Sequence, residues 1–456
     1  MKNNRNYEID MCHGPILKKM LVFTIPLICS SILQLLFNAA DVIVVGRYAG
    51  DNSLAAVGST GSLIGLITNL FLGLSVGANV LVARYYGAKR EEELSETVHT
   101  AILVSIYSGV LLTFVGVFGA KQILVWMQTP KEVVGLATLY LRIYFLGMPA
   151  MMVYNFGSAI LRAVGDTKRP LYFLTGTGVV NVLLNLLFVI KFQWDVAGVA
   201  TATVISQTIA ALLILGCLRR EQGGIRLVLR ELHIHKDKII GIVKIGIPAG
   251  IQGIIFALSN VLIQSSVNSF GAVIVAGNSA AINIESFVYI TMNAFHQATI
   301  SFVGQNMGAG NYKRINRIVF LGEICVMTVG LVFGNLVVLG GKTLLGFYTT
   351  NGAVVKAGMR RLRSICTVYA LCGMMDVMVG ALRGIGYSMI PMLVSIVGVC
   401  GVRILWLATV FQIPEYHNIE MIYFSYPVSW TLTFLVQVLC FFWAKKRITK
   451  KAEVGV

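Results

Sequence analysis

Long apolar stretches separated by short polar gaps run through the whole chain. Most of these stretches exceed 20 residues, the length that an α-helix needs to cross roughly 30 Å of hydrocarbon. Strands of a membrane barrel would instead be alternating segments of about 10 residues. We therefore predict an all-α polytopic membrane protein with twelve transmembrane helices, at about residues 17–45, 54–83, 98–118, 133–156, 170–190, 196–217, 239–268, 273–303, 318–339, 355–381, 388–411 and 419–443.

The composition excludes several classes of protein. Of the 456 residues, 56% are hydrophobic and 12% are charged, whereas soluble domains carry roughly 25% charged residues. The chain therefore has too few charges to coat a water-soluble enzyme. It contains no H-E-x-x-H, G-x-S-x-G or Walker A pattern, so we expect neither an enzyme nor direct use of ATP. The eight cysteines form no C-x-x-C pair, and we expect no metal site and no cofactor.

The basic residues orient the chain in the membrane. The net charge is +17, and 26 of the 37 lysines and arginines fall in the termini and gaps on one side. Loops rich in lysine and arginine stay on the cytoplasmic side. We therefore expect a multi-pass protein of the cell membrane with both termini cytoplasmic. Because membrane topology accounts for the positive excess, the lipid bilayer is an expected partner and nucleic acid is not.

An internal repeat divides the chain into two halves. Leu-Arg-Ala-Val-Gly at 161–165, followed by Pro170, recurs as Leu-Arg-Gly-Ile-Gly at 382–386, followed by Pro391. Both shifts are 221 residues. Six spans in each half place both halves in the membrane in the same direction, as parallel repeats. The predicted parts are an N-terminal lobe (1–217), a basic cytoplasmic linker (218–238) and a C-terminal lobe (239–456).

Polar side chains inside the N-terminal half are candidates for ion coupling, because an ionised carboxylate in hydrocarbon is costly. The first span carries Gln34, Asn38 and Asp41 on one helical face. Later spans carry Asn181 with Asn185, one turn apart, and Thr203. Their oxygens suit a sodium ion and equally suit a carboxyl group that takes up a proton. The alternative is that Asp41 only marks the outer end of the first helix.

The C-terminal half lacks this set, because the shift of 221 replaces Asn181 by Val402 and Asn185 by Trp406. We therefore expect one lobe to bind the coupling ion. Other embedded polar residues are assigned to a substrate cavity: Gln34, Asn38, Asn155, Glu285 and Asp376. For Glu285 and Asp376 the alternative is a hydrogen bond between packed helices.

Three motifs carry a resemblance to the multidrug and toxic compound extrusion (MATE) family. They are Asn-Ala-Ala-Asp at 38–41, the stretch 161–170 after the fourth span, and Val-Gly-Gln-Asn-Met-Gly-Ala-Gly at 303–310. The resemblance implies two six-helix lobes forming a V. It also implies export of drug-like, often cationic, compounds in exchange for sodium ions or protons. The matched positions of the family's N-lobe ion site are Asp41, Asn181, Asn185 and Thr203.

The chain departs from the family at Asn185, where many relatives have an aspartate. This removes a charge and weakens the case for a tight sodium site. The expected protein is a monomeric secondary antiporter with small drug-like substrates. A flippase for a lipid-linked glycan is the alternative, because related folds do that task, but its cavity should be cationic to hold pyrophosphate.

Overall fold

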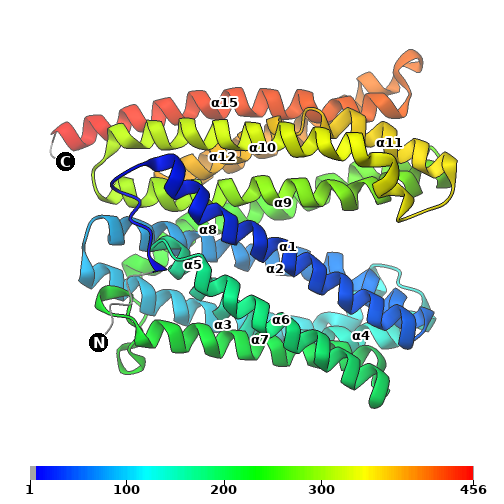
Figure 1. The fold of residues 1–456 in the computed structure, drawn as a ribbon, viewed down its shortest axis with the longest axis horizontal. Helices are drawn as coiled ribbons and strands as arrows, with labels where there is room; N and C mark the ends of the chain where they lie inside the picture. Colours follow the sequence, from blue (N-terminus) through cyan, green and yellow to red (C-terminus); the bar gives the residue numbers. More distant parts are fainter. Residues whose placement is uncertain (1–6, 455–456) are drawn as a thin grey trace. The chain divides into compact units, whose positions relative to one another are not determined.

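The computed structural model describes residues 7–454, and within this range it contains helices and no strand (Figure 1). The α-helices of the N-terminal half are α1 (Ile16–Tyr48), α2 (Asp51–Gly87), α3 (Glu91–Trp126), α4 (Lys131–Leu146), α5 (Met148–Ala163), α6 (Lys168–Leu186) and α7 (Asp195–Arg220). Those of the C-terminal half are α8 (Lys236–Asn268), α9 (Ala272–Gly308), α10 (Tyr312–Gly346), α11 (Gly352–Cys366), α12 (Ala370–Gly384), α13 (Met389–Ser395), α14 (Val402–Ala408) and α15 (Ile419–Val454).

The prediction of twelve spans is confirmed. Ten helical segments of the described chain are each long and apolar enough to cross a membrane. Two further spans are bent pairs, α4 with α5 at 49° and α11 with α12 at 47°. Short π-helical turns continue α6 through Leu187–Lys191 and join α13 to α14 through Ile396–Gly401. The protein is therefore an integral multi-pass membrane protein.

The bend between α4 and α5 has an identifiable cause. Pro149 occupies the first turn of α5, where its missing N–H ends the hydrogen-bond ladder of α4. On the facing helix α3, a side chain at Gly109 would place its Cβ only 2.3 Å from Pro149 Cα. The small residue therefore lets the bent backbone pack closely.

The described chain forms two compact units. The first contains residues 7–10 and 25–250, and the second contains residues 11–24 and 251–454. Helices α1 and α8 each contribute to both units, and the change falls next to Pro26 in α1 and Pro248 in α8. The segment 218–238, predicted as a linker, belongs to the first unit.

The segment 218–238 is held on the first unit by polar side chains of α3 and α6. Glu91 accepts a hydrogen bond from the Gly224 N–H, and the Val228 N–H donates to His99 Nε2 at 3.0 Å. Arg169, in the first turn of α6, forms an ion pair with Glu221. The segment is therefore packed against the lobe that precedes it.

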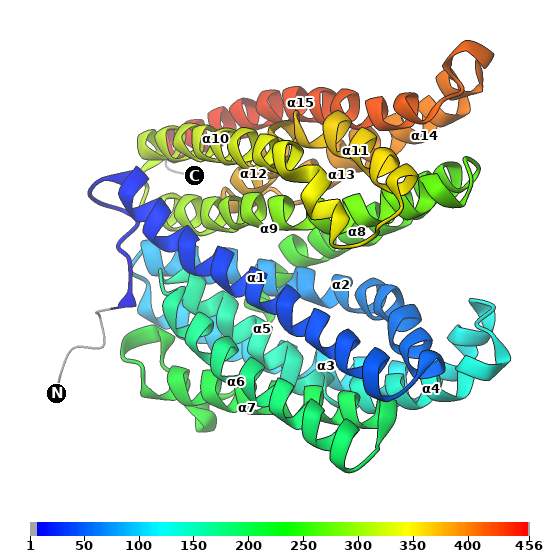
Figure 2. The ribbon, with the colours of Figure 1, turned by 45° about the vertical axis from the view of Figure 1, so that its right-hand side comes forward.

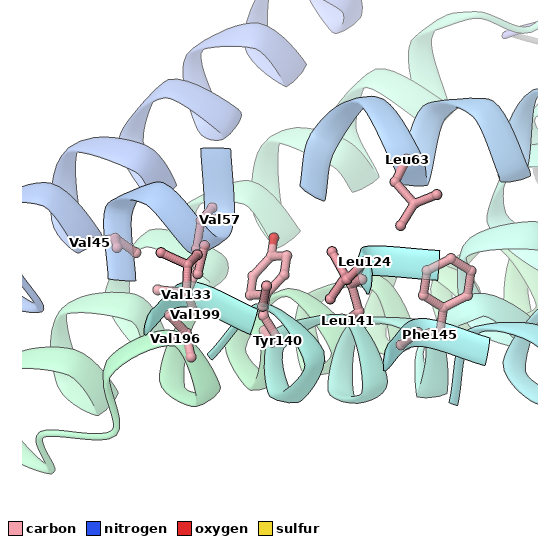
Figure 3. Close-up of a cluster of buried hydrophobic side chains, with 14 of the residues drawn as sticks. Val45, Val57, Leu63, Leu124, Val133, Tyr140, Leu141, Phe145, Val196 and Val199 are labelled. Carbon is pink, nitrogen blue, oxygen red and sulfur yellow. The ribbon is translucent and has the colours of Figure 1, made fainter. Parts of the chain in front are cut away.

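The core of the first unit is a hydrophobic cluster along α4 (Figure 3). Valine, leucine and aromatic side chains from α1, α2, α3 and α7 pack against it, including Val45, Val57, Leu124, Val196 and Val199. Burying each such side chain contributes about 1.5–3 kcal/mol in water. In lipid the gain comes instead from close packing between helices.

Glycines bring α2 and α8 into close approach in the first unit. Gly73 and Gly77 on α2 and Gly246 and Gly250 on α8 are each spaced four residues apart. A Cβ on Gly77 would lie 2.2 Å from the Ile242 carbonyl oxygen. This is the small-residue spacing that lets membrane helices pack backbone against backbone.

The second unit is built on α9. Figures 1 and 2 both show α9, α10, α12 and α15 running alongside one another. Polar side chains such as Glu285 on α9 and Asp376 on α12 are buried, and α10 and α15 carry exposed apolar residues such as Phe320 and Leu439. That pattern places lipid outside and hydrogen bonds inside.

Candidate functional site

A chain of polar side chains joins α1, α6 and α7 in the first unit. Asn185 Nδ2 donates a hydrogen bond to Asp41 Oδ1 and also lies 3.3 Å from Asn181 Oδ1. Asn181 Nδ2 in turn lies 3.4 Å from Thr203 Oγ1. The structure thus brings together all four residues predicted for ion coupling.

The local sequence explains this arrangement. Asn181 and Asn185 are one helical turn apart, so both face the same side of α6, and both are buried. Helix α1 continues for seven residues beyond Asp41 to Tyr48. Asp41 therefore does not mark the end of the helix. The π-helical turn that begins at Leu187 is a feature often found at functional sites in membrane and soluble helices.

The site has spare acceptor capacity. The Asn185 Oδ1 atom is buried and, among the described residues, has no hydrogen-bond partner. A buried amide oxygen without a donor is costly. This oxygen can accept a hydrogen bond from a protonated group, or it can contribute to a small cation site. The side chains present therefore fit cation binding.

The cavity candidates of the first unit form hydrogen bonds within their own helices. Gln34 Nε2 donates to Asn38 Oδ1 at 3.3 Å along α1, and Asn38 is exposed. Asn155 Nδ2 donates to the Met151 carbonyl oxygen of its own helix at 2.8 Å. No hydrogen bond between described residues joins these three side chains to Asp41. They remain predictions for a substrate-binding role.

Glu285 is held in a buried ion pair in the second unit. Arg361 Nε and Nη2 donate to the two carboxylate oxygens at 2.8 and 2.9 Å, and Arg361 Nη1 donates to Asn278 Oδ1 at 2.9 Å. Glu285 is 4% exposed and Arg361 is 5% exposed. Both oxygens of Glu285 are therefore occupied by a cation of the chain itself.

Asp376 lies on α12, and His296 Nδ1 is 2.6 Å from its backbone carbonyl oxygen. No hydrogen bond between described residues connects Asp376 with Glu285, so the structure does not join them in one acidic pair. On α10, both carboxylate oxygens of Glu323 are buried without a hydrogen-bond partner among the described residues.

Two buried arginines of the second unit, Arg361 and Arg403, were not among the predicted site residues. Arg403 donates to Ser429 Oγ at 2.9 Å and lies 4.0 Å from the centroid of the Tyr426 ring. An arginine within an apolar run needs a polar or charged partner. The presence of arginine in such a run is the sequence signal that could have identified both positions.

Comparison with known proteins identifies the family. The family model described as MatE matches residues 26–187 and again residues 248–408. Each match begins at the proline of the first helix of its half. The two matches together span most of the chain, and they agree with the repeat seen in the sequence.

Curated relatives align along nearly the whole length. The probable multidrug resistance protein YoeA of Bacillus subtilis is 28% identical over 444 residues, with 95% of each chain covered. The probable multidrug resistance protein NorM of Thermotoga maritima is 24% identical, with 85% of this chain and 84% of the relative covered. The multidrug export protein MepA of Staphylococcus saprophyticus is 20% identical, with 100% and 99% covered.

Solved structures share the fold. A MATE P26A mutant superposes with a TM-score of 0.88 at 21% identity, covering 97% of this chain and 98% of that one. A transporter of the MOP superfamily from Pyrococcus furiosus superposes with a TM-score of 0.88 at 22% identity, covering 96% and 97%. The chain therefore belongs to the MATE family of multidrug efflux transporters.

Proposed function

We propose that the protein is a secondary antiporter that exports drug-like, mostly cationic compounds in exchange for protons or sodium ions. The observation that carries the proposal is the hydrogen bond from Asn185 to Asp41 inside an apolar lobe. A carboxylate at that depth costs at least about 2.5–3.5 kcal/mol. Reversible binding of a small cation explains why it is tolerated.

The proton is the first choice of coupling ion. The site offers one carboxylate, one amide oxygen without a donor and the Thr203 hydroxyl. A tight sodium site needs more oxygen ligands and more negative charge, and Asn185 supplies no charge. Sodium remains the alternative because the oxygens present are of the type that a hard cation binds.

The energetics are sufficient for efflux. One charge moving inward gains about 2.3 kcal/mol per 100 mV. For an uncharged substrate this supports a gradient between one and two orders of magnitude. Exchange of one monovalent cation for one coupling ion moves no net charge, so a cationic substrate is driven by the concentration gradient of the coupling ion or by more than one ion per cycle. Coupling requires that Asp41 releases its ion when substrate is bound. One conformation of the protein must therefore bind the ion more tightly, and another must bind the substrate more tightly.

The proposed orientation places both termini, the segment 218–238 and the junctions α2–α3 and α9–α10 in the cytoplasm. It rests on the distribution of lysine and arginine described above. A flippase for a lipid-linked glycan gains no support from the second unit, because Arg361 is paired with Glu285 and Arg383 donates to Gln252 Oε1 at 2.8 Å.

The proposal is tested with purified protein in proteoliposomes loaded with ethidium. A proton gradient and a sodium gradient are imposed separately, each with the other ion at equal concentration on both sides. We expect the dye to move against its gradient when the proton gradient is imposed. Dye movement driven by sodium alone supports the alternative ion, and no driven movement with either gradient contradicts antiport.

A further inference from the structure

The second unit carries a basic cavity at the junction between α9 and α10. Its volume is ≈ 640 Å³, and it is lined by Cys12, His13, Gly310, Asn311, Tyr312, Lys313, Arg314 and Thr449. These residues come from three places in the sequence: the segment before α1, the start of α10 and the end of α15. All belong to the second unit.

The stretches that line this cavity are strongly basic. The stretches 11–19, 310–317 and 440–450 contain no aspartate or glutamate. They contain nine lysines and arginines: Lys18, Lys19, Lys313, Arg314, Arg317, Lys445, Lys446, Arg447 and Lys450. The corresponding edge of the first unit is mixed, because its basic residues are accompanied by acids such as Glu8, Glu93 and Glu96.

The start of α10 has an unfavourable charge for a helix N-terminus. The first turn of α3 carries Glu91, Glu92 and Glu93, which stabilise the positive end of the helix dipole. At the repeat shift of 221 residues, α10 carries Tyr312, Lys313 and Arg314 instead. Cations at this end cost free energy unless an anion is bound there.

Arg314 shapes the wall of the cavity. Its Nη2 lies 3.1 and 2.8 Å from the carbonyl oxygens of His13 and Gly14. Lys313 is exposed and forms no hydrogen bond or ion pair with any residue that the structure describes. One basic side chain therefore fixes the loop before α1, while the neighbouring one is available to a ligand.

The position of the cavity along α15 corresponds to the headgroup region of the bilayer. On α15, Trp443 is 53% exposed, and its ring lies 5.6 Å from the guanidinium carbon of Arg447. Exposed tryptophan is typical of the membrane–water interface. From Trp443 to Thr449 the helix rises about 9 Å, which is enough to cross the headgroup region on one side of a bilayer, about 5–8 Å deep.

We infer that this cavity binds the headgroup of an anionic phospholipid from the cytoplasmic leaflet. The inference rests on the orientation proposed above. The phosphate meets Lys313 and the N-terminus of α10, and the acyl chains lie on the exposed apolar faces of α10 and α15. The ligand is a negatively charged phosphate diester, and a free phosphate ion shares only its headgroup chemistry.

The test uses the full-length protein in detergent and measures retained lipid by native mass spectrometry. Phosphatidylglycerol, phosphatidylcholine and inorganic phosphate are titrated in separate arms. The charge-reversal variant Lys313→Glu is compared with Arg219→Glu, which changes an exposed cation at the end of α7. Both side chains are exposed, so both variants are expected to fold.

We expect the wild-type protein and Arg219→Glu to prefer phosphatidylglycerol over phosphatidylcholine. Lys313→Glu should lower the affinity for phosphatidylglycerol at least about fivefold, since one basic residue near the surface contributes about 1 kcal/mol. Equal retention of the two lipids, an unchanged Lys313→Glu variant, or binding of inorganic phosphate without lipid preference would overturn the inference. The assay measures lipid binding and not transport, so a negative result here can be distinguished from a negative result in the antiport experiment.

Discussion

Arg361 donates hydrogen bonds to both carboxylate oxygens of Glu285 at 2.8 and 2.9 Å, inside the second unit. The pair neutralises the charge of Glu285 with a cation of the chain itself, and both side chains are buried. A buried pair of this kind is costly to break because the remaining charge has no partner. The geometry therefore supports a structural contribution from Glu285.

Replacing one member of this pair should destabilise the protein. We expect Glu285→Gln to lower the free energy of unfolding by about 3–5 kcal/mol, because Arg361 is left buried and unpaired. The double variant Glu285→Gln/Arg361→Met should recover most of that loss. Thermal unfolding of the detergent-solubilised protein measures both. An unchanged Tm together with weaker dye transport would instead indicate substrate binding by Glu285.

A second ion pair fixes the segment 218–238. Arg169 contacts Asp166 and Glu221, which are buried. We expect Arg169→Met to destabilise the first unit by about 3–5 kcal/mol, because two buried carboxylates lose their counter-charge. Lys168→Met, at the neighbouring position, is the control and should change stability by less than about 1 kcal/mol. Limited proteolysis of residues 218–238 should accelerate only in Arg169→Met.

Glycine packing between α2 and α8 gives a third prediction. A methyl group on Gly77 meets the Ile242 carbonyl oxygen at 2.2 Å, whereas a methyl group on Gly65 of the same helix meets no atom within 4 Å. Gly77→Ala should therefore lower stability by about 1–3 kcal/mol, and Gly65→Ala should not. A similar Tm for the two variants would show that α2 and α8 are not closely packed.

Asn185 should be required for coupling. We expect Asn185→Leu to lower gradient-driven dye transport at least about tenfold, because Asp41 loses its hydrogen-bond donor and the site loses an oxygen. Asn335→Leu is the matched control, since Asn335 is exposed and bonds only to its own helix in the described structure, and it should retain driven transport. Equal transport by the two variants would contradict the assignment of Asn185.

Most of the fold could be predicted from the sequence because each span must satisfy its own backbone hydrogen bonds in lipid. Long apolar runs therefore translate directly into helices. The bends did not appear in the prediction, because runs such as 133–156 remain apolar across the break at Gly147. The place where α1 and α8 change units depends on packing between distant residues, and hydropathy does not report it.

The candidate ion site was predictable because helical spacing places Asn181 and Asn185 on one face. The residues that pair with the embedded acids of the second unit could not be predicted in the same way. Arg361 and Glu285 are 76 residues apart, and no periodicity links them. A charged side chain in an apolar run needs a counter-charge. The sequence therefore indicates that a partner exists, but it does not specify which residue that partner is.

The most direct test of the account is dye transport by Asp41→Asn in proteoliposomes under an imposed proton gradient. The substitution keeps a polar side chain of similar size beside Asn185 and removes the group that can be ionised. We expect dye accumulation driven by the gradient to fall to the level of protein-free liposomes, while dye binding to the purified variant is retained. Undiminished driven transport by Asp41→Asn would contradict the coupling role of Asp41.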